Sequence, residues 1–534
     1  MTDADVLVIG AGASGAAAAW RLAGAGLRVV CLEQGGWVDP RTVPTLDDDW
    51  ERQRVGPWHP NPNVRRGPAD YPVDDSRSPI RPLMFNGVGG STVMWSCLAP
   101  RFRPTDFRAR SLDGVADDWP ISYDDLAPYY ALNERMMGVA GLAGDPSLPA
   151  RPAPPFAPVG LNPTERRLAA AADGLGWHWW PADITVTTRA TADRAACNHC
   201  GPCELYCPHR AKGSADVTYW PAALRAGARI VTQARVFRIE TDAQGRATGA
   251  AFYDAAGVAR RMTADAVVLA ANGVGTARLL LLSSSGRAPG GLANSSGLVG
   301  RTLMLHPIAR VTGIFPDPVG GHRGIAAGAI TSMEFYDTDA ARGFVRGCKL
   351  HVLRSHGPAF VARGSTAGRL PWGRAHHRRF AEVFDRTLSV SICADDLPED
   401  DNRVVLHDTL ADANGIPAPC MVYRVSENSR RILDFGIARA RELLAAAGAS
   451  EMVEVPLIAD AGFHLMGTAR MGNDPARSVI DGFGRAHDVP NLFVVDGSAF
   501  VTAAAVNPTH TLQAIALRTA DHIVESRRLA AAPH

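Results

Sequence analysis

The feature that most constrains the fold is a glycine-rich turn between two short apolar runs near the start of the chain. The runs cover residues 6–9 and 27–32, and each has the continuous apolar character of a strand buried on both faces. Between them lie the turn Gly10-Ala-Gly12-Ala-Ser-Gly15 and an alanine-rich stretch that predicts a helix. Strand, turn, helix and strand in this order predict a βαβ unit, and so an α/β fold with a parallel sheet.

The same turn predicts a dinucleotide site. Gly10 permits the tight turn, Gly12 lets a pyrophosphate approach the backbone, and Gly15 lets the helix pack closely on the strand. The helix N-terminus offers free N–H groups and a partial positive charge to the phosphates. Glu33 ends the second run, where a carboxylate accepts hydrogen bonds from ribose hydroxyls. The order of strand, turn, helix, strand and acidic residue makes a glycine-rich turn that binds no ligand the less favoured interpretation. It does not distinguish an FAD site from an NAD site.

Size and charge exclude several classes of protein. A chain of 534 residues with 46% hydrophobic content is too long for one compact core. Its 55 Lys and Arg against 54 Asp and Glu give no reason to expect nucleic acid or an anionic membrane as a partner. The acidic start lacks the features of a secretory signal, and no apolar run approaches the ~18–20 residues of a membrane span. We therefore expect a cytoplasmic protein.

Several stretches, taken in order, resemble the glucose-methanol-choline (GMC) oxidoreductases from end to end. They are Asn86-Gly-Val-Gly-Gly-Ser-Thr92 with Trp95, residues 119–126, 128–130, 272–279 and 294–300, His464-Leu-Met-Gly-Thr-Ala-Arg-Met-Gly472, residues 495–498, and Asn507-Pro-Thr509. The flavin loop and the Asn-Pro-Thr ending look closest to the bacterial pyranose oxidases and glycoside 3-oxidases. The resemblance implies bound FAD and oxidation of an alcohol.

The resemblance also implies a two-part architecture. An α/β FAD-binding Rossmann-like domain is built from discontinuous segments, and an α+β substrate domain carries a large antiparallel sheet. We expect the FAD-binding domain in residues 1–40, 80–110, 210–307 and 456–534. The substrate domain is expected in residues 41–79, 111–209 and 308–455, with a cysteine-rich loop at 197–207.

By the same resemblance, the cofactor contacts come from several parts of the chain. Gly10, Gly12, Gly15 and Glu33 would hold the ADP half, and the backbone of Val236 would meet the adenine. Gly89, Gly90, Ser91 and Thr92 would lie against the isoalloxazine ring, and Asp496 near the pyrophosphate or ribityl chain. Some relatives attach FAD through a histidine just before the loop tryptophan. Met94 precedes Trp95 here, so no flavin–histidine bond is expected.

Oxidation of a CH–OH group by hydride transfer to flavin N5 needs a base for the hydroxyl proton and a partner for the developing alkoxide. His464, in the family's His-x-x-Gly-Thr motif, is the predicted proton acceptor, and Asn507 the predicted anchor of the substrate oxygen. The alternatives are a histidine satisfied within the core and a turn residue before Pro508. His510 is a second candidate base, and His306 resembles a family position that we expect to be structural.

Substrate determinants are expected in residues 308–455, where members of the family differ most. The polar and aromatic candidates there are Arg323, Phe335 and His351, and each is equally compatible with a structural role.

Four of the nine cysteines form one run, Cys197-x-x-Cys200-x-x-Cys203-x-x-x-Cys207. This spacing matches the bacterial ferredoxin pattern, and Cys197, Cys203 and Cys207 resemble the ligands of GMC sugar dehydrogenases with a three-iron cluster. Other GMC proteins have a similar stretch ending in Ala-Lys, as Ala211-Lys212 does here, where the loop is packed and its thiols are reduced. Zinc is a further alternative.

The sequence thus predicts an FAD-dependent enzyme that oxidises a CH–OH group of a small alcohol, sugar or glycoside. Two alternatives stay open. One is an electron-transfer flavoprotein subunit with an iron–sulfur cluster and no substrate oxidation of its own, and the other is a nicotinamide-dependent dehydrogenase. Oxygen, a quinone or a cytochrome could each be the electron acceptor.

Overall fold

The computed structural model describes residues 2–45, 50–354, 357–364 and 368–531. Its N-terminal unit is the predicted βαβ arrangement: β1 (Ala4–Ile9), α1 (Ala13–Gly24) and β2 (Val29–Leu32). β1 and β2 are parallel, with Val6 opposite Val29. β2 is buried along its whole length, and so is β1 apart from one half-buried residue. The second strand begins at Val29 rather than at Leu27, because Arg28 is exposed. Continuous burial explains why Val6–Ile9 and Val29–Leu32 are apolar without alternation.

A seven-stranded sheet is built from widely separated parts of the chain. Its order is β5-β2-β1-β8-β7-β6, and β16 pairs alongside the C-terminal part of β8. The added strands are β5 (Arg229–Val231), β6 (Arg235–Thr241), β7 (Ala247–Tyr253), β8 (Ala259–Leu269) and β16 (Leu492–Val494). β1, β2, β5 and the inner half of β8 are parallel, whereas β6, β7 and β8 form an antiparallel meander. This is the predicted discontinuous Rossmann-like sheet.

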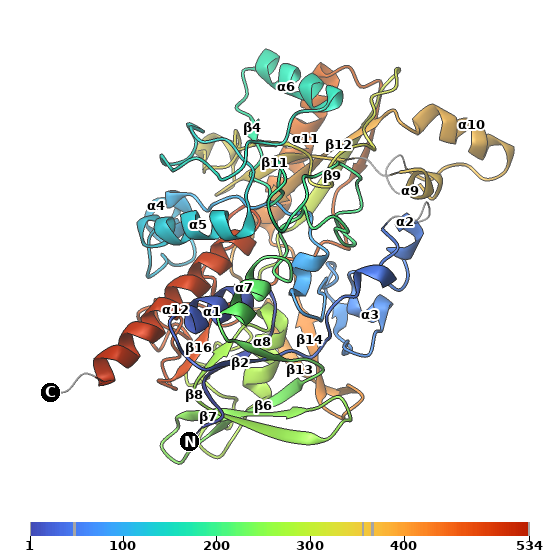
Figure 1. Cartoon of the computed structure of the whole chain (residues 1–534). Coiled ribbons are helices and arrows are strands. Elements are labelled where there is room, and N and C mark those ends of the chain that lie inside the picture. The colour runs from blue at the N-terminus through green and yellow to red at the C-terminus, as the bar shows by residue number, and fades with distance from the viewer. Residues whose placement is uncertain (1, 46–49, 355–356, 365–367, 532–534) are drawn as a thin grey trace.

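The C-terminal helix α12 (Thr509–Ala531) lies beside α1 on one face of this sheet (Figure 1). Arg21 of α1 pairs with Asp521 of α12, which joins the two ends of the chain. Helix α8 (Asn272–Leu282) begins where β8 ends, close to the glycine-rich turn.

The predicted large antiparallel sheet forms a second layer system, above the first in Figure 1. Its order is β15-β9-β12-β11-β10-β4, and every pair in it is antiparallel. The strands are β4 (Trp180–Pro181), β9 (Ile308–Ile314), β10 (Ile330–Ser332), β11 (Cys348–Leu353), β12 (Thr387–Ala394) and β15 (Glu451–Val455).

The two faces of this sheet differ in polarity. Leu388, Val390 and Ile392 of β12 share a core with residues of α6 (Pro163–Leu175) and α11 (Glu427–Ala446). The alternate residues Ser389 and Ser391 are also buried, yet they lie on the opposite face because neighbouring side chains of a strand point to opposite sides. A buried polar face is therefore turned away from the helices.

A three-stranded sheet and several short helices complete the molecule. The sheet joins β3 (Asp74–Arg77), β13 (Arg403–Ala411) and β14 (Pro417–Val422), with β3 parallel to β14. The remaining α-helices are α2 (Trp50–Gln53), α3 (Pro62–Arg65), α4 (Ala109–Asp113), α5 (Tyr123–Met137), α7 (Tyr219–Arg225), α9 (Pro358–Ala362) and α10 (Arg374–Val383). Within the described ranges, no helix is both long and apolar enough to cross a bilayer. The exact domain boundaries stay a prediction.

Candidate active site

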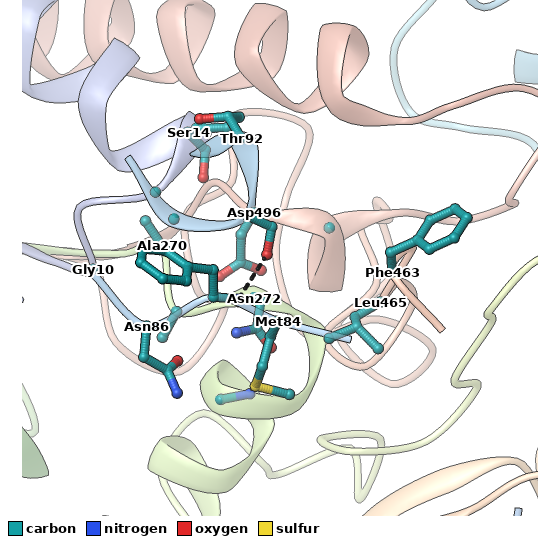
Figure 2. A pocket seen from close by; sticks show the side chains of 18 of the residues that line it. Gly10, Ser14, Met84, Asn86, Thr92, Ala270, Asn272, Phe463, Leu465 and Asp496 are labelled. Atoms are coloured by element: carbon teal, nitrogen blue, oxygen red, sulfur yellow. Dashed lines mark hydrogen bonds between the residues drawn. The ribbon is translucent and has the colours of Figure 1, made fainter. Parts of the chain in front are cut away.

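One cavity of about 300 Å³ connects the glycine-rich turn to His464 and Asn507. Its walls come from the turn after β1, the loop around residues 83–98, the junction of β8 with α8, and two C-terminal segments around residues 460–466 and 496–512. Figure 2 shows this convergence through side chains from all of these segments: Gly10, Ser14, Met84, Asn86, Thr92, Ala270, Asn272, Phe463, Leu465 and Asp496.

The glycine-rich turn has the shape of a phosphate cradle. Gly10 has a φ of +102°, and a Cβ there would lie 2.5 Å from the carbonyl oxygen of Ala270. A Cβ on Gly15 would lie 2.0 Å from the Gly10 oxygen, so this position requires the close helix–strand contact that glycine allows. Gly12 instead lines the cavity, and a Cβ there would make only an ordinary van der Waals contact, 3.8 Å from the Gly90 Cα.

Helix α1 starts at this cradle without a side-chain cap, so its first N–H groups are free for a ligand. Glu33 is buried, and its two carboxylate oxygens accept hydrogen bonds from the N–H groups of Ala11 at 2.7 Å and Gly35 at 2.9 Å. Glu33 thereby fixes the turn while still lining the cavity. The residues present therefore fit the pyrophosphate and ribose of a dinucleotide.

The second glycine loop crosses directly over the first. Gly89 and Gly90 have φ values of +97° and +54°, and a Cβ on Gly90 would lie 2.7 Å from the Gly12 Cα. Thr92 Oγ1 donates to the Gly89 oxygen at 2.6 Å and accepts from the Ala215 N–H at 2.9 Å, which fixes the loop. Gly90, Ser91 and Thr92 line the cavity, whereas Gly89 shapes the loop from behind.

The other predicted cofactor residues also reach the cavity wall. Val236 lies at the start of β6, next to Ala234. Asp496 is buried and accepts hydrogen bonds from Thr276 Oγ1 at 2.5 Å and from the Ser498 N–H at 2.9 Å. Its burial raises the pKa of the carboxyl group above its ordinary value. Met94 and Trp95 line the cavity as well, and the buried Trp95 Nε1 has no hydrogen-bond partner among the described residues.

The two predicted catalytic side chains meet at the far end of the cavity. His464 Nε2 lies 3.3 Å from Asn507 Nδ2, and His464 Nδ1 lies 2.8 Å from His306 Nδ1. Burial lowers the pKa of His464 well below its ordinary value, and the nearby His306 and Lys349 lower it further. His464 is therefore a neutral imidazole at neutral pH, the form that can take up a proton.

Local backbone pairing explains why His306 and His464 face one another. Met304 and Met466 exchange two backbone hydrogen bonds, of 3.0 and 3.1 Å, in an isolated antiparallel bridge. In an antiparallel pair, the residue two positions after Met304 lies opposite the residue two positions before Met466. His306 and His464 are therefore partners in the same register.

Family models described as GMC oxidoreductase match residues 4–308 and residues 398–516. The chain belongs to the GMC oxidoreductase family. As a GMC oxidoreductase, it is an FAD-dependent enzyme that oxidises a CH–OH group. Neither the electron-transfer alternative nor the nicotinamide alternative receives support from these matches.

Relatives of this GMC oxidoreductase match over nearly the whole chain. The 2-methyl-1,2-propanediol dehydrogenase of Mycolicibacterium austroafricanum is 42% identical, covering 98% of this chain and 95% of the relative. The fructose dehydrogenase large subunit of Gluconobacter japonicus is 32% identical, covering 98% of both. The crystal structure of pyridoxine 4-oxidase from Mesorbium loti has a TM-score of 0.66 at 16% identity over 100% of both chains, which shows the shared fold. The finer likeness to pyranose oxidases and glycoside 3-oxidases is not confirmed.

Lys349 of this GMC oxidoreductase was not anticipated from the sequence. Its ammonium group is fully buried and donates a hydrogen bond to Asn507 Oδ1 at 2.5 Å, and burial lowers its pKa to about 8. The available signal was the strand Cys348-Lys-Leu-His-Val-Leu353, where polar residues alternate with apolar ones. Lys349 and His351 share the polar face of the antiparallel sheet, and both lie close enough to His464 to affect its pKa.

The remaining candidates lie elsewhere. His510 is buried against Asn133 at 2.7 Å and Glu134 at 3.7 Å, outside the cavity lining. Phe335 packs edge-on against Trp177 and Phe435 in the core behind the antiparallel sheet. Arg323 does not line the cavity either.

The cysteine-rich loop lies beside the cavity. Lys212, five residues after this loop, is buried and donates to the Val93 oxygen at 2.7 Å and the Cys203 oxygen at 2.5 Å. It thereby ties the cysteine-rich loop to the flavin loop. Glu204 lines the cavity and pairs with Arg54.

The four thiols of this loop are free, and burial raises the pKa of Cys197, Cys200 and Cys203, that of Cys200 to about 11. Over the described ranges, no three His, Cys, Asp or Glu side chains are grouped so as to hold a metal ion. Cys197, Cys203 and Cys207 thus do not form a ligand set here, and the iron–sulfur hypothesis gains no support from the geometry.

Proposed function

We propose that this enzyme oxidises a hydroxyl-bearing carbon of a small polar alcohol, diol or sugar, with His464 as the base and Asn507 as the anchor of the substrate oxygen. The observation that carries the proposal is the meeting of these two side chains, 3.3 Å apart, in the cavity that begins at the glycine cradle. A single cavity thus joins a dinucleotide cradle to a base and an amide donor.

The roles follow from what each group can do. FAD, when bound along this cavity, supplies the acceptor for the hydride of the carbinol carbon. His464 Nε2 accepts the hydroxyl proton, and its lowered pKa keeps it unprotonated until substrate arrives. The Asn507 amide N–H donates to the substrate oxygen and stabilises the negative charge that develops there. Leu465 and Met466 form apolar wall beside the base and limit the access of water.

The polar face of the antiparallel sheet supports a hydroxyl-rich substrate. Lys349 and His351 extend this face toward His464, and the buried His351 Nδ1 has no hydrogen-bond partner among the described residues. Neither side chain lines the cavity itself, so this face places polar groups behind the base and Asn507 rather than in direct contact with substrate. Relatives named for a diol and for fructose act on small polar alcohols of this kind.

Anaerobic flavin reduction tests this function. Purified enzyme is mixed with 2-methyl-1,2-propanediol, fructose or paromamine, the last chosen because a paromamine 6'-oxidase of Streptomyces fradiae is 32% identical over 97% of this chain. We expect at least one of them to bleach the flavin absorbance. The matched control is 2-methyl-2-propanol, which has a hydroxyl group but no carbinol hydrogen. A colourless protein that reduces NAD would contradict the proposal.

The roles of the two side chains need a variant. His464→Gln should keep its flavin and lose roughly 10²–10⁴-fold in the rate of flavin reduction. An unchanged rate in this variant would show that another group is the base.

The electron acceptor and the location stay open to experiment. Reoxidation of the reduced enzyme by air, by a soluble quinone and by a cytochrome identifies the acceptor. Iron and acid-labile sulfide analysis decides whether the cysteine-rich loop carries a cluster. We propose a cytoplasmic location, which the free thiols of all nine cysteines support, because disulfides are rare in reducing compartments. Cell fractionation tests it.

A further inference from the structure

A chain of hydrogen bonds runs through the proposed base, and the group at each of its ends has only one possible role. In order, its members are the Ala504 carbonyl, His306, His464, Asn507 and Lys349. A carbonyl oxygen can only accept a hydrogen bond, and an ammonium group can only donate. The protons between these two ends can therefore be assigned from each end separately.

The assignment from the carbonyl end starts at His306. Its Nε2 lies 2.5 Å from the Ala504 oxygen and 3.2 Å from the Ala503 oxygen, so Nε2 must carry a proton. Burial lowers the pKa of His306 to about 4, so the ring is neutral at pH 7 and its Nδ1 is an acceptor. His464 Nδ1, 2.8 Å away, must then be the donor. A neutral His464 has one ring proton, so its Nε2 is left unprotonated.

The assignment from the ammonium end reaches the same result. The atom of Asn507 that faces the Lys349 ammonium group at 2.5 Å must be the oxygen. The amide nitrogen of Asn507 therefore points to His464 Nε2 and donates to it at 3.3 Å. A nitrogen that accepts this bond carries no proton. Both ends thus require the same tautomer of His464.

The backbone holds the carbonyl end under strain. His306 and Ala504 have φ values of +56° and +58°, a left-handed conformation that is unfavourable for residues other than glycine. Such conformations persist only where the surrounding structure enforces them, and they concentrate at functional sites.

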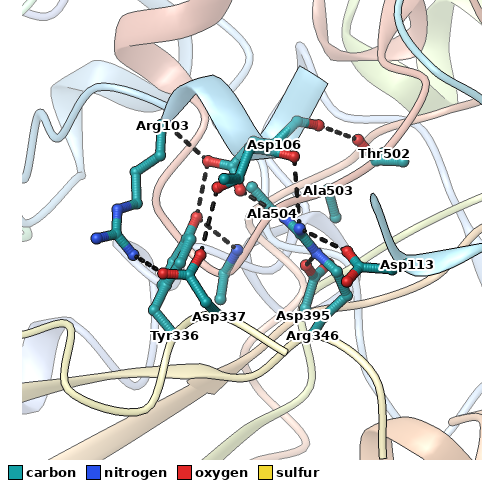
Figure 3. A network of polar contacts seen from close by, with 12 residues as sticks. Arg103, Asp106, Asp113, Tyr336, Asp337, Arg346, Asp395, Thr502, Ala503 and Ala504 are labelled. Atoms are coloured by element: carbon teal, nitrogen blue, oxygen red, sulfur yellow. Dashed lines mark hydrogen bonds and ion pairs between the residues drawn. The ribbon is translucent and has the colours of Figure 1, made fainter. Parts of the chain in front are cut away.

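A buried polar network fixes the loop that carries the Ala504 carbonyl (Figure 3). The Ala505 N–H donates to Tyr336 Oη at 3.3 Å, and Tyr336 Oη donates to Asp106 at 2.9 Å. Thr502 Oγ1 donates to the Asp106 backbone oxygen at 3.1 Å, and Arg346 pairs with the Asp106 carboxylate at 2.5 Å. The acceptor for His306 is therefore held in place by contacts on both sides of it.

We infer that His306 and Lys349 are positioning residues that hold His464 in the tautomer whose Nε2 can take the substrate proton. The inference rests on the proposed role of His464. The substrate hydroxyl replaces the Asn507 N–H at Nε2, and the Asn507 N–H then donates to the substrate oxygen. When Nε2 takes up the proton, His464 Nδ1–H still donates to His306. The charged and titratable groups that face this pair are Lys349, His351 and, beside His306, Asp395.

Nitrogen NMR of the flavin-loaded enzyme, with ¹⁵N-labelled histidine, reads the tautomers directly. We expect His464 to be protonated at Nδ1 and bare at Nε2, and His306 to show the opposite pattern. The lines are assigned by their loss in His464→Gln and in His306→Asn. A neutral His464 with its proton on Nε2 would overturn the inference. This readout needs no turnover, so it stands apart from any failure of the proposed function.

Flavin reduction by the alcohol that reduces the wild-type enzyme is the second test. His306→Asn keeps an acceptor close to the position of Nδ1 and suits a left-handed backbone, so it should retain most of the rate. His306→Leu removes the acceptor and should lose on the order of 10²-fold or more with full flavin content.

The pH profile separates control of the tautomer from a change in the pKa of His464, and the rescue by His306→Asn separates it from general damage to the fold. The loss in His306→Leu should be the same at every pH above the acid limb, because the tautomer ratio of a neutral ring does not change with pH. A wild-type rate in this variant would overturn the inference. If the variant does not fold, the NMR pattern of the wild-type enzyme decides.

Discussion

Gly12→Ala should separate folding from cofactor binding. A Cβ at Gly12 meets nothing closer than the Gly90 Cα at 3.8 Å, and the φ of −74° suits alanine. The folded chain therefore accommodates the methyl group. Its cost to the fold is the loss of a favourable helix N-cap residue, about 0.5–1 kcal/mol.

The loss in the free energy of FAD binding is larger, because the methyl group fills the space where the pyrophosphate would contact the start of α1. Two charge-assisted hydrogen bonds from free N–H groups at that helix end are worth about 1.5–3 kcal/mol each. Losing both weakens binding by about 3–6 kcal/mol, or roughly 10²–10⁴-fold in Kd. Gly15→Ala would instead disrupt the fold, because its Cβ would lie 2.0 Å from the Gly10 oxygen.

Titration of apoenzyme with FAD measures the Kd, and circular dichroism measures the thermal midpoint. The matched control is Gly24→Ala, in the same helix, where a Cβ meets no atom within 4 Å. We expect wild-type FAD affinity from Gly24→Ala and a near-wild-type midpoint from both variants. Wild-type FAD affinity in Gly12→Ala would refute the assignment of the cradle.

Three further predictions concern buried charges. The rate of flavin reduction should fall only as the pH drops below 6.5. A base is active above its own pKa, and burial lowers the pKa of His464 below the ordinary value of 6.5. The rate should also fall as the pH rises through about 8, where Lys349 loses its proton. Stopped-flow measurement of Lys349→Met should show no such decrease at high pH. Arg346→Met leaves three buried carboxylates without their cation and should destabilise the fold by about 3–5 kcal/mol in urea, whereas the exposed Arg431→Met should change it by under about 1 kcal/mol. Lys212→Met strands two buried carbonyls behind the flavin loop and should lower the flavin retained after gel filtration.

Local patterns were enough to predict the βαβ unit and the tight glycine-rich turn, whose cofactor contacts stay proposals. The βαβ unit and its glycines follow from apolar runs and turn chemistry within about thirty residues, which is the range over which such patterns are informative. His464 and Asn507 came from a family resemblance rather than from spacing. The structure brings both to the cavity, and their catalytic roles stay proposals.

The second half of the site depends on how two sheets dock. Lys349 reaches Asn507, and His306 reaches His464, each across 158 residues of sequence. No period or motif reports which face of a strand will meet a segment so far away. The cysteine run is the opposite case. Its spacing matches a known ligand pattern, but in the part of the chain that the structure describes its thiols do not converge as a metal site requires.

The sheet that carries the cradle has a consequence for synthesis of the protein. β8 pairs with β1 near the beginning of the chain and with β16 near its end. Val494 must therefore leave the ribosome before β16 can pair with β8. Until then, residues 267–269 of β8 have no strand beside them on the edge opposite β1. An open parallel strand is a template for unwanted pairing between nascent chains. Production of soluble enzyme should therefore improve at low temperature and with added chaperones, and removal of residues 492–534, which include β16, should leave an insoluble product.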